Sequence, residues 1–70
     1  MKHWREGVNN WHLYYDDVTG KIVGRVGYNN YDDTAIAKFN DKDLGEYITL
    51  EKAKTAVEYA NYTFETGYVR

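Results

Sequence analysis

Cysteine is absent from this chain of 70 residues, and so is any long run of apolar residues. Without cysteine no disulfide can stabilise the fold, and His3 and His12 are too few for a structural zinc site without thiolates. No apolar run approaches the ~20 residues of a membrane span. The segment MKHWREGVNN at the start lacks the apolar core of a signal peptide. We therefore expect a soluble, cytoplasmic protein without a metal or another cofactor.

An excess of charge of one sign is absent as well. Nine Lys and Arg residues against eleven Asp and Glu residues give a net charge of −2, too balanced for a protein whose affinity rests on nucleic-acid phosphates. The pairs Asp16–Asp17 and Asp32–Asp33 suit turns, and no segment has the ligand order of a calcium loop. The chain also shows no nucleophile with an obvious base and no glycine-rich phosphate loop. We expect a non-enzymatic protein without a metal site.

Aromatic residues, in contrast, are abundant: eight Tyr, two Trp and two Phe make up 17% of the chain. A chain of this length forms one domain and buries only about 60% of the surface that its unfolded form exposes. Its stability therefore depends on aromatic packing or on association. Several Tyr side chains are expected at the surface, where Tyr is typical of binding interfaces. The alternative is that Tyr is present only because it suits β-strands.

The segment WHLYYDDVTGKIVGRV, Trp11 to Val26, predicts a β-hairpin, because two apolar runs flank a turn rich in Asp, Thr and Gly. We expect a four-residue loop over 17–20, with Gly20 at the position that needs a positive φ. The predicted cross-strand pairs are Tyr15 with Ile22, Leu13 with Gly24 and Trp11 with Val26. The predicted inner face consists of Trp11, Leu13, Tyr15, Ile22 and Val26. The predicted outer face consists of His12, Tyr14, Val23 and Arg25.

The remaining pattern predicts a loop over 27–33, a third strand over 34–39 and a short extended segment in LGEYI. A helix is expected over 50–66, with Thr49 as its N-cap and Gly67 as its stop. Its apolar stripe is Leu50, Ala53, Val57, Ala60 and Phe64. The prediction is one α+β domain over residues 1–70: a three- to four-stranded antiparallel β-meander packed against one C-terminal α-helix. Residues 1–10 are interpreted as a flexible N-terminus.

The segment GEYITLEKAKTAVE is similar to a pattern found in small, mostly uncharacterised phage-encoded proteins. In these an N-terminal Trp and a hairpin with Gly precede a helix of the form G-Y/F-x-T/S-L-x-x-A-K-x-x-V/A-E. The matching residues are Gly45, Tyr47, Thr49, Leu50, Ala53, Lys54, Val57 and Glu58, with Trp11, Gly20 and Gly24 upstream. The resemblance covers roughly residues 11 to 60, whereas NNYDD and the Tyr-rich helix end depart from the pattern. It implies a phage accessory protein in the host cytoplasm that binds and inhibits a host or anti-phage defence protein, as anti-CRISPR proteins do.

Two surfaces are candidates for binding a partner. On the helix, Tyr59 and Tyr62 lie off the apolar stripe at 100° per residue. On the sheet, the predicted outer face contains His12, Tyr14, Arg25, Ile36 and Lys38. The leading hypothesis is occlusion of a protein partner through these residues. The alternatives are single-stranded nucleic-acid binding through the outer sheet face, although the flanking Asp pairs repel phosphates, and a small homodimeric structural protein.

Overall fold

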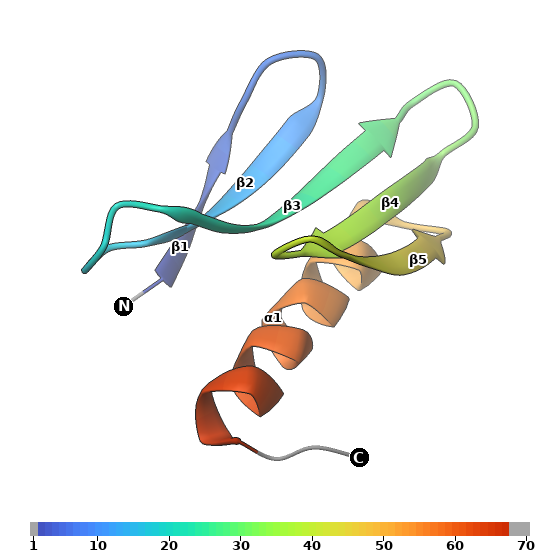
Figure 1. Ribbon diagram of the computed structural model, residues 1–70. Coiled ribbons are helices and arrows are strands. Elements are labelled where there is room, and N and C mark those ends of the chain that lie inside the picture. The colour runs from blue at the N-terminus through green and yellow to red at the C-terminus, as the bar shows by residue number, and fades with distance from the viewer. Residues whose placement is uncertain (1, 68–70) are drawn as a thin grey trace.

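The computed structural model describes residues 2–67, apart from the side chain of Thr66. It is an α+β fold, as predicted, in which one antiparallel sheet packs against one C-terminal helix (Figure 1). The sheet has five strands in the order β1-β2-β3-β4-β5, where the sequence predicted three or four. The elements are β1 (Lys2–Glu6), β2 (Trp11–Asp16), β3 (Ile22–Asn29), β4 (Thr34–Phe39), β5 (Lys42–Tyr47) and α1 (Leu50–Thr66).

The first strand corrects the interpretation of residues 1–10 as a flexible N-terminus. β1 pairs with β2 along its whole length, from Lys2 opposite Asp16 to Glu6 opposite His12. Between the strands Asn9 and Asn10 have φ values of 56° and 65°, and the Trp11 N–H donates to the Val8 carbonyl at 3.1 Å. Positive φ at both central residues is the mark of a type I′ turn, which suits the twist of a hairpin. The Asn9–Asn10 pair was therefore the signal for this strand.

The turn between β2 and β3 has the predicted form. Gly20 has a φ of 73°, and the Asp16 N–H donates to the Lys21 carbonyl at 2.9 Å. Tyr15 lies opposite Ile22, also as predicted. Beyond that pair the register changes, because Tyr14 lies opposite Gly24 and leaves Val23 as an extra residue in β3. This β-bulge shifts every later pair by one residue.

The bulge makes the predicted face assignment of β2 wrong. His12 and Tyr14 now pair with Val26 and Gly24, whose side of the sheet faces α1. The other side, predicted to be inner, carries three half-buried residues: Trp11, Leu13 and Tyr15. Since side chains alternate along a strand, one extra residue is enough to exchange the two sets.

The core lies between α1 and strands β3 to β5. Its buried residues are Val26, Ala35, Ala37, Phe39, Ala53 and Val57. Gly24 faces α1, since a methyl group at this position would lie 2.5 Å from Cγ1 of Val57. β3 extends to Asn29, so the predicted loop over 27–33 is shorter than expected and spans 30–33.

The helix has both predicted caps. The Thr49 hydroxyl accepts a hydrogen bond from the Lys52 N–H at 3.1 Å, and Gly67 adopts the left-handed conformation with a φ of 72°. Of the predicted stripe, Ala53 and Val57 are fully buried, whereas Phe64 is 67% exposed and forms an edge contact with the Phe39 ring. Within residues 2–67 no helix is both long and apolar enough to span a membrane.

Candidate binding surfaces

The sheet face that points away from α1, called the open face below, has a row of cations across its middle. Cross-strand pairing aligns Arg5 with Leu13, Leu13 with Arg25, and Arg25 with Lys38. Arg5, Arg25 and Lys38 are exposed. Within residues 2–67, neither the Arg25 nor the Lys38 side chain forms an ion pair or a side-chain hydrogen bond. Two unpaired cations therefore lie directly opposite each other at the centre of the sheet.

Aromatic side chains flank this row on both sides. On one side, a methyl group at Gly27 would lie 3.0 to 3.1 Å from three ring carbons of Trp11. Such equal distances mean that the indole lies flat on Gly27. On the other side, the Tyr15 ring lies 5.8 Å from the His3 ring and 5.3 Å from the Arg5 guanidinium. The open face thus combines stacked aromatic rings with cations.

Acidic groups on the open face are confined to its margins. Asp43 and Glu46 lie on the edge strand β5, opposite Lys38 and Ile36. Asp17, in the loop after β2, contacts the His3 imidazole. The middle of the face, over β1 to β4, therefore has a positive charge although the whole chain has a net charge of −2.

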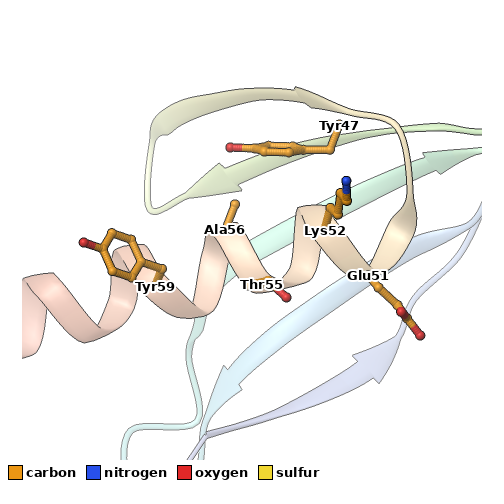
Figure 2. Close-up of a pocket in the computed structure, with 6 residues that line it drawn as sticks. All are labelled: Tyr47, Glu51, Lys52, Thr55, Ala56 and Tyr59. Carbon is orange, nitrogen blue, oxygen red and sulfur yellow. The ribbon is translucent and has the colours of Figure 1, made fainter.

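A groove of about 530 Å³ lies on the other side of the molecule, between the end of β5 and α1. This helix groove is lined by Tyr47, Glu51, Lys52, Thr55, Ala56 and Tyr59. Figure 2 shows the Tyr47 ring above α1 over Ala56, with Tyr59 one turn further along the helix. The Tyr47 hydroxyl donates to the Leu44 carbonyl at 3.2 Å, which fixes that ring as one wall of the groove.

Both helix tyrosines selected from the sequence are exposed. The Tyr59 side chain lines the helix groove and is 63% exposed, and Tyr62, one turn further, is 61% exposed. Ile48, just before the helix, is 68% exposed. Large exposed side chains thus occur just before α1, at Ile48, and in its C-terminal half, at Tyr59 and Tyr62, and of these Tyr59 lines the helix groove.

His12 and Tyr14 lie in a third place, on the helix side of the sheet. The Tyr14 ring packs on Trp4 with centroids 4.6 Å apart, and burial raises its pKa. Burial also lowers the pKa of His12, and the nearby Lys54 ammonium adds to that decrease. Because both side chains pack beside α1, neither contributes to the open face.

The structure therefore brings together only part of the predicted site. Arg25 and Lys38 are neighbours on the open face, whereas His12 and Tyr14 are on the opposite face and Tyr59 and Tyr62 are on the helix. Sequence reasoning did not place Arg5, Trp11 and Tyr15 on the open face. Arg5 was excluded with residues 1–10, and the two aromatic residues were assigned to the core because the bulge was not anticipated.

Metal-binding geometry was not found in the part of the chain that the structure describes, where no three His, Asp or Glu side chains are grouped. No family model matches the chain, and no curated protein or solved structure shows significant similarity to it. The resemblance to phage-encoded proteins stays a prediction, and so does the absence of enzymatic activity.

Proposed function

We propose that this chain is a non-enzymatic binding protein that attaches to a protein partner through the helix groove and the tyrosines beside it. One observation supports this function above the others: Tyr59, 63% exposed, lines a groove with a fixed Tyr47 wall, and Tyr62, 61% exposed, follows one turn further along α1. Tyr is a frequent anchor residue of protein interfaces, because it has a large area, few rotatable bonds and one polar end.

The edge strand beside the groove favours contact through side chains. In β5 the extra residue Leu44 forms a bulge opposite β4, and Gly45 has a φ of 110°. A bulge breaks the regular row of backbone donors and acceptors that an added strand needs. A partner would therefore insert side chains between Tyr47 and Tyr59 and would not extend the sheet.

The partner proposed is the one that the sequence resemblance implies, a host or anti-phage defence protein. Binding would occlude a surface of that protein and inhibit it. The acidic residues of this chain lie mostly in loops and at strand ends, and they would steer it toward a basic partner. The chain would act in the host cytoplasm, and its inhibition would need no cofactor.

Affinity capture from a bacterial lysate tests this function. The immobilised protein is expected to retain one protein in stoichiometric amount, and Tyr59→Ala or Tyr62→Ala is expected to weaken the complex about tenfold or more. Tyr31→Ala is the matched control, since Tyr31 is 95% exposed in the β3–β4 loop. Recovery of no stoichiometric protein would overturn the proposal, and so would an equal effect of Tyr31→Ala. A melting temperature that depends on protein concentration would favour the homodimer instead.

A further inference from the structure

We propose that the open face is a second binding site, independent of the helix groove, and that it takes single-stranded nucleic acid. The proposal rests on three features of the open face: the row of cations, the aromatic rings on both sides of it and the shape of the sheet. A balanced net charge argued against nucleic acid at the level of the whole sequence. In the structure the cations lie across the middle of the open face and the acids lie at its margins, so the argument from net charge does not apply to this face.

The row of cations has the charge and extent of a track for phosphates. Arg5, Arg25 and Lys38 stand on β1, β3 and β4, and strands about 4.8 Å apart give the row a length of roughly 14 Å. Directly opposite like charges destabilise a sheet, and neither Arg25 nor Lys38 forms an ion pair among residues 2–67, although Asp43 on the edge strand lies opposite Lys38. A bound polyanion would neutralise this pair.

The aromatic rings provide surfaces on which bases can stack, which cations alone would not provide. Trp11 lies flat on Gly27 and therefore presents the second face of its indole outward, where a base can stack. Tyr15 lies on the far side of the cation row, about 14 Å from Trp11 along β2 at roughly 3.4 Å per residue. A backbone that follows the cations would thus have the outward face of Trp11 on one side for a base, and on the other side Tyr15, which His3 and Arg5 already contact.

The shape of the face selects a single strand over a duplex. All five strands present a pleated surface here, and no helix lies on this side of the sheet in residues 2–67 (Figure 1). Reading a duplex requires an element that enters a groove, whereas unpaired bases can lie on a sheet and stack. An acidic polypeptide would satisfy the cations but would leave the outward face of Trp11 without a base to stack on it.

Fluorescence anisotropy with a labelled oligothymidylate of about 15 nucleotides tests the site. We expect binding at low salt with a slope of log K against log salt of about −2, the value for three phosphate contacts on a single strand. Lys38→Ala is expected to weaken binding severalfold. Lys52→Ala, which removes the same charge at the helix groove, is expected to leave it unchanged.

Stacking is tested separately from charge. Trp11→Leu, checked for folding by circular dichroism, is expected to weaken binding roughly tenfold. An oligonucleotide of abasic sites tests the same contact on the unaltered protein and is expected to bind correspondingly less well. Four results would overturn the proposal. The first three are no binding at low salt, equal effects of Lys38→Ala and Lys52→Ala, and equal affinity for the abasic strand. The fourth is equal competition by poly-glutamate, which would favour an acidic polypeptide as the ligand. Retention of a lysate protein by the helix groove is measured independently, so either proposal can fail alone.

Discussion

Gly24 determines how closely the sheet and the helix approach each other. A methyl group here would lie 2.5 Å from Cγ1 of Val57, which is fully buried, and 3.3 Å from the Lys38 carbonyl oxygen. We expect Gly24→Ala to lower the free energy of unfolding by about 1–3 kcal/mol, as overpacking of a dense core does. Urea unfolding followed by circular dichroism measures the loss.

A double-mutant cycle shows whether Val57 is the cause. Val57→Ala alone leaves a cavity, but it removes the methyl group that an alanine at position 24 would meet. The double variant is therefore expected to lose less free energy of unfolding than the two single variants lose together, by about 1 kcal/mol. Strict additivity would mean that the cost of Gly24→Ala arises from the backbone and not from this contact.

His12 is a second residue whose surroundings have a measurable consequence. Its pKa is lowered by burial and by the Lys54 ammonium, and Glu6 opposes this only in part. In the unfolded chain the imidazole titrates near pH 6.5, so just below that pH the unfolded state binds more protons than the folded state. The contribution of His12 to stability is therefore fully present above about pH 6.5 and declines as the pH falls through that value.

The pH dependence can be measured by urea unfolding between about pH 7.5 and pH 5.5. As the pH falls, the unaltered protein is expected to lose stability relative to the His12→Gln variant, because glutamine does not titrate. Asp16, whose pKa is lowered chiefly by a hydrogen bond from the Val18 N–H, loses its contribution only at more acidic pH. A difference that stays constant over this range would contradict the assignment.

Among the elements, β1 is attached to α1 by side chains that cross from the first strand to the helix. The Trp4 indole N–H donates to Glu58 at 2.8 Å, and the Lys54 ammonium lies 5.1 Å from the ring centroid. At the start of the strand, Lys2 forms an ion pair with Glu65, to which its ammonium also donates a hydrogen bond. This hydrogen bond is the main reason why the pKa of Lys2 is raised. The two ends of the chain thus stabilise each other.

This attachment predicts that a change in β1 affects the helix. Trp4→Ala is expected to lower the free energy of unfolding by about 2 kcal/mol and to increase amide hydrogen exchange in the C-terminal half of α1. Trp4→Phe retains an aromatic ring, although a smaller one, but not the N–H donor, and is expected to cost about 1 kcal/mol. Unchanged exchange in α1 after Trp4→Ala would show that β1 packs only on β2.

The elements also differ in how far the sequence could predict them. α1 could be predicted because its N-cap, apolar stripe and terminal glycine are local signals that agree with one another. The β2–β3 register could not, since nothing in KIVGRV marks Val23 as an extra residue. Exposure of Tyr59 and Tyr62 follows from helix geometry alone, whereas the placement of His12 and Tyr14 depended on the register and was wrong.

At the scale of the whole molecule, the two proposed sites lie on opposite sides of the sheet. The helix groove opens beside α1, and the open face covers the side without a helix. A ligand at one site therefore does not obstruct the other. The charges are also separated, with cations across the middle of the open face and acids in loops, near strand ends and on α1. This division is invisible in a net charge of −2.

The bulge at Val23 has a consequence for how such a protein can evolve. In a regular register Leu13 would lie opposite Gly24, and the side chains that β2 now presents on the open face would turn toward α1. Deletion of Val23 would not produce this arrangement, because Tyr14 would still lie opposite Gly24 and the ladder would only become regular. The two faces of β2 are thus exchanged by a slip of register at constant chain length. Substitutions that favour one register over the other are therefore a short mutational path between a sheet with a covered aromatic face and one with an exposed aromatic face.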